Sequence, residues 1–346
     1  CPNCKGEARR ETDTMDTFVN SSWYFLRYCD PKNKNKIFDS EKANYWNPID
    51  IYIGGKEHAC MHDIYFRFYT KFLRDLGLVS FSEPAKKLFN QGFIYGTDGR
   101  KMSKSYGNVV LPEDAAKKYG VDAVRLFLVS VASPDKDFEW SETGCEGSFR
   151  FVNKVLDYFK KVKIGKSSAK VEHKVNKTIK EIISEIENFE YNFAVIKLRS
   201  LFENFEEEVS KKDLESFVKI FSIFCPHLSE ELWEKIGNKK LISLSDWPKF
   251  DEKKINENFD KIEKVIEKTV ADILNILKII KEKQNKDGEK TYLYVLPNEL
   301  EFYSSDELQK RIGKEVKIFA VNDPKKYDPE EKSKKVKPGR PGIYVE

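Results

Sequence analysis

The sequence has few histidines and cysteines and no long apolar run. Its 346 residues include four histidines and six cysteines, and no stretch approaches the ~18 apolar residues that a membrane-spanning helix needs. The cysteines are too scattered for a disulfide framework, and no secretory signal opens the chain. We therefore expect no membrane segment and a location in the reducing cytoplasm.

An excess of charge of one sign is also missing. Lysine and arginine number 61 against 57 aspartates and glutamates, a formal net charge of +4. This balance neither demands nor excludes a nucleic-acid partner, so any RNA contact must come from a local patch. We favour such a patch over a merely soluble tail near the end of the chain, where five basic residues crowd together: Lys332, Lys334, Lys335, Lys337 and Arg340.

Residues 13–145 alternate short apolar runs with helical patterns, which is typical of an α/β layer with a parallel sheet. We expect strands over 50–55 and 88–95 and one helix over 57–76. One side of that helix would carry apolar residues at fourfold spacing, namely Ile64, Phe68, Phe72 and Leu76. Ligands bind beyond the carboxyl ends of parallel strands, so the turn after residue 53 and the loop after residue 95 are candidate sites.

The pattern changes after residue 146. Helical spacing of large apolar residues predicts a bundle over 147–288, with a long amphipathic helix near 259–280 and a polar break over 283–290. The final segment, 289–346, predicts strands over 291–296, 315–321 and 342–345 and a helix over 304–312. The expected fold is α/β over 1–146, all-α over 147–288 and a small α+β module over 289–346.

The segment Lys101-Met102-Ser103-Lys104-Ser105 follows the second predicted strand and a glycine-containing turn. Lysine is a common phosphate ligand, and serine hydroxyls and nearby backbone N–H groups add hydrogen bonds. The segment is either a polyphosphate-binding loop or an ordinary solvated loop, since short Lys/Ser runs are common.

Two residues separate Cys1 from Cys4, and Lys5-Gly6 follows, as in a zinc-knuckle turn. A structural zinc ion needs two further ligands, and the sequence contains no second pair of this kind. Either the other ligands lie on a preceding segment, which we favour, or the pair binds no metal.

Several stretches together resemble class I aminoacyl-tRNA synthetases, and among them leucyl-tRNA synthetase, most like the archaeal type. They are RRETDTMDTFVNSSWYFLRYCDP (9–31), NYWNPIDIYIGGKEHACMH (44–62), NQGFIYGTDGRKMSKSYGNVV (90–110), YGVDAVRLFLVSVASPDKDFEWSETGCEG (119–147), SDWP (245–248) and PGRPGIYVE (338–346). Several class I enzymes share the KMSKS signature, so GGKEHACMH is the discriminating stretch. The likeness is dense in the first part of the chain and thin through the bundle.

The resemblance also indicates what is missing. The family's His-x-Gly-His signature and its inserted editing domain have no counterpart among these residues. We therefore expect the C-terminal half of a Rossmann-like class I catalytic core, followed by an anticodon-binding-type bundle and a tRNA-binding module. Such a chain would be a fragment, or one subunit of a split enzyme, and would need the N-terminal half for activity.

The reaction implied by the resemblance is ATP-dependent activation of leucine, with Mg²⁺, and transfer of the leucyl group to tRNA(Leu). Lys101 and Lys104 would neutralise the developing pyrophosphate and act as catalytic residues. The resemblance assigns further ATP contacts to Gly54, Gly55, Glu57, Gln91, Gly92, Met102, Ser103 and Ser105. A non-catalytic tRNA- or RNA-binding protein derived from a synthetase is the alternative function.

His58 and His62 are four residues apart on the predicted helix and would share a face. They could form a metal pair, but no third ligand is evident, or a structural pair. We prefer what the resemblance implies, that both border the leucine side-chain pocket together with Phe18 and Tyr52. An apolar pocket distinguishes one methylene by only ~1–3 kcal/mol, so ring shape would have to reject other aliphatic amino acids.

Overall fold

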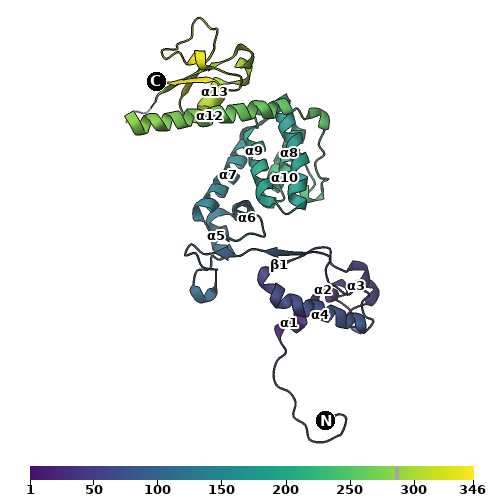
Figure 1. Cartoon of the computed structure of the whole chain (residues 1–346). Coiled ribbons are helices and arrows are strands. Elements are labelled where there is room, and N and C mark those ends of the chain that lie inside the picture. Colours follow the sequence, from purple (N-terminus) through teal and green to yellow (C-terminus); the bar gives the residue numbers. More distant parts are fainter. Residues whose placement is uncertain (285–287) are drawn as a thin grey trace. The chain divides into compact units, whose positions relative to one another are not determined.

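The computed structural model describes residues 1–284 and 288–346 (Figure 1). The chain forms two compact units, one of residues 1–165 and 178–248, the other of residues 166–177 and 249–346. These units reflect compactness alone, so the division into three domains stays a prediction. In the described part of the chain, no helix is long and apolar enough to cross a membrane.

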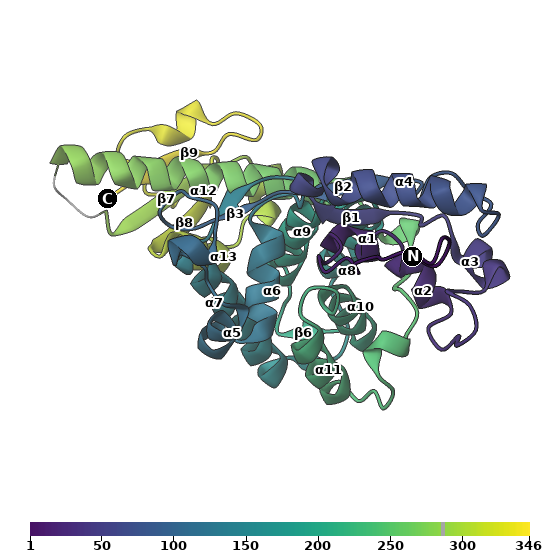
Figure 2. The same ribbon diagram turned by 90° about the horizontal axis from the view of Figure 1, so that it is seen from below.

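The first unit begins with short helices packed around an aromatic core. These elements are α1 (Thr17–Ser21), α2 (Tyr24–Cys29), α3 (Ser40–Trp46), β1 (Tyr52–Gly55), the 3₁₀ helix η1 (Lys56–Cys60) and α4 (His62–Asp75). Phe25, Phe38 and Phe66 are buried together with Leu26 and Leu73. This core holds α2 and α4 on each other, and α4 runs beside strand β1 in Figure 2.

The strands of this unit form two-stranded parallel sheets, so the predicted parallel pairing is confirmed. Strand β1 pairs with β2 (Leu88–Gln91), which places Gly54 opposite Asn90 and Gly55 opposite Gln91. Strand β3 (Ile94–Tyr95) pairs instead with β4 (Phe138–Glu139). The prediction of one strand over 88–95 was wrong, because the chain changes partner at Gly92.

The prediction of one helix over 57–76 was also wrong. The chain turns sharply at Met61 (φ −129°, ψ −98°), between η1 and α4. On α4, His62, Phe66 and Leu73 are buried. The stripe predicted from fourfold spacing faces solvent instead, with Ile64, Phe68, Phe72 and Leu76 between 46% and 70% exposed.

The rest of the first unit is mainly helical. Its main helices are α5 (Pro112–Tyr119), α6 (Val121–Ser130), α7 (Glu142–Lys161), α8 (Ala169–Glu187), which continues from the second unit, α9 (Tyr191–Glu203), α10 (Lys211–Phe221) and α11 (Pro226–Lys235). Short pieces complete it, namely η2 (Lys104–Tyr106), β5 (Lys163–Ile164), β6 (Glu208–Val209) and η3 (Ile242–Leu244). Proline occupies the first turn of α5, where its lack of an N–H costs no helical hydrogen bond.

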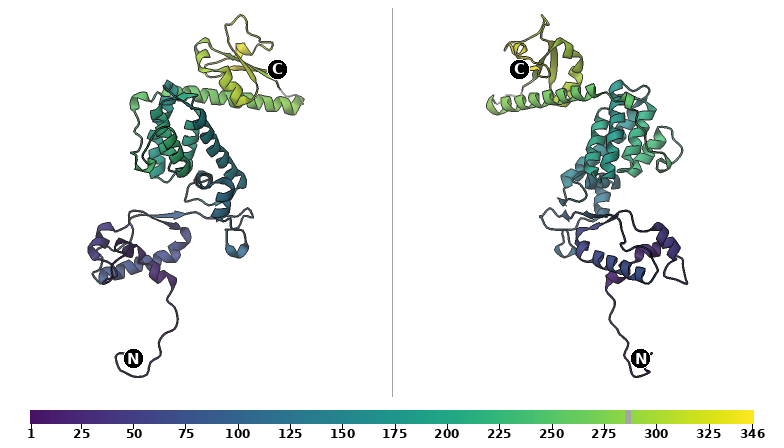
Figure 3. Two further views of the ribbon diagram at one scale, coloured as in Figure 1. Left: turned by 180° about the vertical axis from the view of Figure 1, so that it is seen from behind. Right: turned by 45° about the vertical axis from the view of Figure 1, so that its right-hand side comes forward.

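The predicted aromatic stripes of the bundle are only partly core. Phe159, Phe217 and Phe221 are buried, and Phe217 stacks on Phe221 with centroids 5.5 Å apart. Phe193 on α9 is instead 46% exposed. Helical spacing therefore located the helices but not every buried face; Figure 3 shows α7 to α10 from two further sides.

The second unit contains the long helix and the small sheet that the sequence predicts, although the prediction assigns that helix to the preceding bundle. Its elements are η4 (Glu252–Lys254), α12 (Glu257–Gln284), β7 (Lys290–Val295), η5 (Pro297–Phe302), α13 (Ser305–Ile312), β8 (Glu315–Ala320), η6 (Lys332–Lys335) and β9 (Gly342–Val345). Strand β7 is central, parallel to β8 and antiparallel to β9. Ile266, Ile273 and Leu293 are in the hydrophobic core of this unit. Part of the predicted polar break, residues 285–287, lies outside the described residues.

Candidate active site

The four side chains predicted to border a leucine pocket lie together. Phe18 follows the cap of α1, where the Asp16 carboxylate accepts its backbone N–H. Its ring centroid is 6.4 Å from that of His58 and 6.2 Å from that of His62. The two imidazoles are 5.8 Å apart, and Tyr52 is 5.9 Å from His62. The break between η1 and α4 thus keeps both histidines beside the same aromatic group.

A chain of hydrogen bonds fixes these rings. The Tyr52 hydroxyl lies 2.8 Å from Nε2 of His62 and 3.0 Å from the Tyr24 hydroxyl. Burial lowers the pKa of His62 and raises that of Tyr52, so both rings are neutral at pH 7. Neutral rings suit an apolar ligand. The sequence analysis missed Tyr24, which has no motif of its own and is recognised only by its contact with Tyr52.

A cavity of about 220 Å³ opens beside these rings. Its lining includes Tyr52, Ile53, Gly54, Gly55, His58, His62, Asp63, Leu88 and Asn90. Four buried polar atoms in this lining have no hydrogen-bond partner within the described residues: Nδ1 of His58, Nδ1 of His62, Oδ2 of Asp63 and Oδ1 of Asn90. Buried polar groups normally have partners, so these atoms indicate a place for a ligand or for further polypeptide.

The glycine turn connects the cavity to the KMSKS loop. A β-carbon on Gly55 would lie 2.4 Å from Oε2 of Glu57, so glycine lets the carboxylate fold back over the turn. Oε1 of Glu57 is 3.5 Å from Nζ of Lys101. The Glu57 backbone N–H and the Lys101 ammonium lower the pKa of this carboxyl. The first lysine of the loop therefore reaches the residue that precedes His58.

The loop itself is a tight turn followed by η2. The Gly96 N–H donates to the Arg100 carbonyl over 2.8 Å, and Gly99 takes the left-handed conformation (φ 71°). Oγ of Ser103 accepts the Ser105 N–H over 3.2 Å and caps η2. Met102 packs against a buried cluster that includes Phe127. These contacts fix the base of the loop.

Lys104 differs from Lys101 in its surroundings. It is exposed, and it has no ion pair with any residue that the structure describes. Lys101 instead lies over the Phe93 ring at 3.7 Å. An exposed, uncompensated ammonium is free to meet an anion.

Lys56, Phe93 and Asp137 form a cluster that sequence reasoning did not assign to the site. Nζ of Lys56 lies 4.4 Å from the Phe93 ring centroid and 2.7 Å from Oδ1 of Asp137. The same Asp137 oxygen accepts the Phe93 N–H over 2.7 Å. The sequence offers little sign of this cluster beyond the position of Lys56 in the glycine turn, because its partner Asp137 is 81 residues away.

Gln91 and Gly92 end strand β2. Gln91 pairs with Gly55, which puts it at the edge of the glycine turn. The Gly92 N–H donates to the Pro134 carbonyl over 2.9 Å. A β-carbon on Gly92 would lie 2.1 Å from the Lys136 carbonyl oxygen, so only glycine fits this crossing.

Cys1 and Cys4 are exposed and free. The Lys5 N–H donates to the Cys1 carbonyl over 2.9 Å, which closes a turn of the kind that the sequence predicts. Across the described residues, no group of three potential metal ligands occurs. Two exposed thiols do not make a structural zinc site, so zinc would need ligands from another segment.

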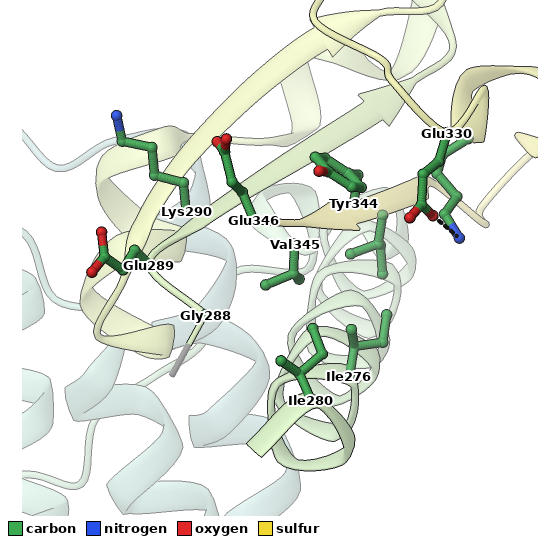
Figure 4. A pocket seen from close by; sticks show the side chains of 11 residues that line it. Ile276, Ile280, Gly288, Glu289, Lys290, Glu330, Tyr344, Val345 and Glu346 are labelled. Carbon is green, nitrogen blue, oxygen red and sulfur yellow. Dashed lines mark ion pairs between the residues drawn. The ribbon is translucent and has the colours of Figure 1, made fainter. Parts of the chain in front are cut away.

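The second unit contains a cavity of about 960 Å³ between α12 and the sheet (Figure 4). Ile276 and Ile280 line it from α12 and Val345 lines it from β9, while Tyr344 lies on the other side of that strand. Charges of both signs surround it, including Glu330 and Lys332, which pair at 3.0 Å. None of the residues predicted for the site lines this cavity.

Two family models and several relatives match this chain. A family model of class I tRNA synthetases (I, L, M and V) matches residues 2–141, and one of the anticodon-binding domain of tRNA ligases matches residues 169–293. The leucine–tRNA ligase of Petrotoga mobilis is 45% identical over 278 residues, which are 72% of this chain and 34% of that protein. That of Thermotoga maritima is 44% identical over 279 residues, 73% of this chain and 34% of that protein.

A solved structure also matches. It is the ternary complex of an Agrobacterium radiobacter LeuRS with tRNA and LeuAMS, with a TM-score of 0.63 and 33% identity over 74% of this chain and 36% of that one. The chain thus spans about a third of the length of the relatives it matches. These relatives are bacterial, so the archaeal likeness stays a prediction.

Proposed function

This chain belongs to the leucyl-tRNA synthetase family of class I aminoacyl-tRNA synthetases, and from that premise we propose that it forms part of an active leucine–tRNA ligase. It would supply the leucine pocket and the KMSKS loop, while an N-terminal half supplies the remaining catalytic residues. The observation that carries the proposal is the 3.5 Å contact between Lys101 and Glu57, which brings the loop beside the aromatic group of the pocket.

The leucine side chain would enter the cavity lined by Tyr52, His58 and His62, with Phe18 closing it. The hydrogen bond between Tyr52 and His62 gives this pocket a fixed shape, and shape is what an apolar site uses to select among aliphatic side chains. The amino-acid carboxylate would then point towards the glycine turn, where Gly54 and Gly55 let the ATP ribose approach the backbone.

Activation would proceed without a protein nucleophile. A leucine carboxylate oxygen attacks the α-phosphorus of ATP, the bond to the bridging oxygen breaks, and pyrophosphate leaves with its Mg²⁺. Lys101 and Lys104 would neutralise the charge that develops on pyrophosphate, which is catalysis by positioning and charge. A ribose hydroxyl at the end of tRNA(Leu) would then attack the leucyl carbonyl and release AMP.

The helical region would bind the tRNA. A match to the anticodon-binding domain over 169–293 supports this role. In the second unit, Lys335, Lys337 and Arg340 have no acidic partner within the described residues and would contact phosphates. We place the enzyme in the cytoplasm, where tRNA is charged.

The test is leucine-dependent ATP–pyrophosphate exchange after the chain is mixed with a leucyl-tRNA synthetase N-terminal half. We expect exchange in the mixture and a fall in kcat of ~10²–10³-fold for Lys104→Ala. Lys117→Ala, a variant of an exposed lysine on α5, is the matched control and should leave exchange unchanged. If the mixture binds tRNA(Leu) but shows no exchange, the non-catalytic RNA-binding function replaces the proposal.

A further inference from the structure

We infer that the corner between α8 and α9 positions the nucleotide side of the active site, with Phe189 and Asn192 as positioning residues. This inference rests on the proposed function and adds residues that no motif identifies. The corner belongs to the helical region, yet its side chains reach the catalytic region at two points. Phe189 contacts strand β2 just before Gln91, and Asn192 contacts the segment that hydrogen-bonds Gly92.

The backbone of Phe189 is in a conformation that favours glycine. Helix α8 ends in a Schellman motif, in which the Glu190 N–H donates to the Glu185 carbonyl over 2.7 Å and the Phe189 N–H donates to the Ile186 carbonyl over 3.1 Å. The residue at this position of the motif is left-handed, and here Phe189 has φ 62°. A bulky residue in this region is an outlier that the surrounding structure must hold in place.

The ring of Phe189 explains why glycine is absent. It packs on Phe89 of strand β2, with centroids 4.6 Å apart, and lies 5.8 Å from Nζ of Lys87. Phe89 is two residues before Gln91, and its own strand partner is Ile53, which lines the proposed leucine cavity. Phe189 thus packs against strand β2, which pairs with the strand that lines the proposed leucine cavity.

Asn192 holds the other side. Its Oδ1 accepts the Ser133 hydroxyl over 3.3 Å, and the next residue, Pro134, provides the carbonyl that accepts the Gly92 N–H over 2.9 Å. Asn192, Ser133, Pro134 and Gly92 therefore form one connected series. Phe189 therefore packs against β2 just before Gln91, and Asn192 hydrogen-bonds the segment whose carbonyl accepts the Gly92 N–H.

This arrangement fixes the point where β2 ends and the chain crosses to β3. Gln91 and Gly92 are among the residues that the resemblance assigns to ATP contacts, and a shift of about 1 Å in such a group is enough to cost a large factor in rate or binding. Loss of the brace should therefore impair ATP more than leucine, because Tyr52 and His62 are held by their own hydrogen bonds on the other side of the cavity.

The decisive variant is Phe189→Gly, which removes the ring and also the unfavourable backbone conformation. We expect its Tm to stay within about 4 °C of the wild type. In the reconstituted enzyme, KM for ATP should rise ~10-fold while KM for leucine changes less than ~2-fold. Phe189→Tyr keeps the ring and should restore the wild-type KM, and Phe193→Ala, an exposed aromatic on α9, is the control that should change neither KM.

Hydrogen–deuterium exchange of the chain alone separates this inference from the proposed function. Faster exchange of amides 88–92 in Phe189→Gly, with the split in KM, supports the positioning role. Unchanged exchange of those amides, or equal effects on both substrates, overturns it. If the wild-type mixture shows no pyrophosphate exchange, the proposed function fails; the deuterium result then decides whether the corner braces β2.

Discussion

A β-carbon at Gly92 would lie 2.1 Å from the carbonyl oxygen of Lys136 and 2.7 Å from the backbone nitrogen of Asp137. Both neighbours are backbone atoms, which cannot turn aside as a side chain can. We expect Gly92→Ala to lower the free energy of unfolding by about 1–3 kcal/mol, the usual cost of overpacking.

Urea unfolding measures this change, with Gly147→Ala as the control. Gly147 lies inside α7, and a β-carbon there would have no other atom within 4 Å. Alanine should therefore stabilise the helix by up to ~1 kcal/mol. A Gly92→Ala variant as stable as the wild type would show that residues 136–137 do not lie against this strand end.

Glu142 gives a prediction about pH. The Lys118 ammonium, the Tyr119 hydroxyl and the Trp140 indole N–H all donate to its carboxylate, at 2.7, 2.6 and 2.9 Å, and lower its pKa to about 2. The unfolded value is ~4.3, so the folded state binds this proton less readily and the stabilisation is present above that pH. It is lost as the pH falls towards the folded pKa.

Thermal unfolding between about pH 6 and pH 3 tests this linkage. We expect the Tm of Glu142→Gln to fall less over this range than that of the wild type, because the variant has no carboxylate to protonate. Glu146→Gln, a more distant exposed carboxylate on α7, should keep the wild-type slope. Identical slopes for all three proteins would contradict the account.

Single residues were predictable where a motif marks them. The matching stretch 44–62 pointed to Tyr52, His58 and His62, and the structure brings these rings together, although their role stays a proposal. Lys56 and Phe93 were missed because their partner Asp137 is far away in the sequence. A single sequence carries no signal for such a contact.

At the scale of the elements, a carboxylate on α6 caps the N-terminus of α11. Helix α11 has no side-chain cap of its own, and Asp122 of α6 takes that role. Its Oδ2 accepts the Leu228 N–H over 2.7 Å, and its Oδ1 lies 2.9 Å from Nδ1 of His227. Asp122 is only 6% exposed, and its removal would leave the Leu228 N–H without this partner.

We expect Asp122→Ala to lower the free energy of unfolding by about 1–3 kcal/mol, through the lost cap and the unsatisfied N–H. Denaturant titration measures this value. Asp157→Ala removes an exposed carboxylate on α7 that pairs with Lys160, and should change stability by less than ~0.5 kcal/mol. Equal effects of the two variants would refute the cap.

Elements were predictable in type more readily than in extent. Apolar spacing located α12, and the strands of the last sheet were predicted close to their observed bounds. The predictions failed at Met61 and Gly92, where the chain changes direction because of tertiary contacts. Gly92 reads as a strand residue in the sequence, and only the approach of residues 136–137 shows that the strand must end there.

At the scale of the whole molecule, the first unit has only two-stranded sheets and leaves an apolar stripe of α4 exposed. Ile64, Phe68 and Phe72 lie uncovered on a helix whose opposite face is in the core. The chain also spans about a third of the length of its relatives. The absent motifs led us to expect an N-terminal half, but they gave no sign of which face of α4 is exposed.

Our proposal depends most on one point, that Phe18, Tyr52, His58 and His62 hold leucine beside the KMSKS loop. Its most direct test is the amino-acid dependence of ATP–pyrophosphate exchange by the chain mixed with an N-terminal half. We predict exchange with leucine, and kcat/KM at least ~10-fold lower with isoleucine or valine. Exchange that responds equally to all three amino acids, or to none of them, would contradict the account.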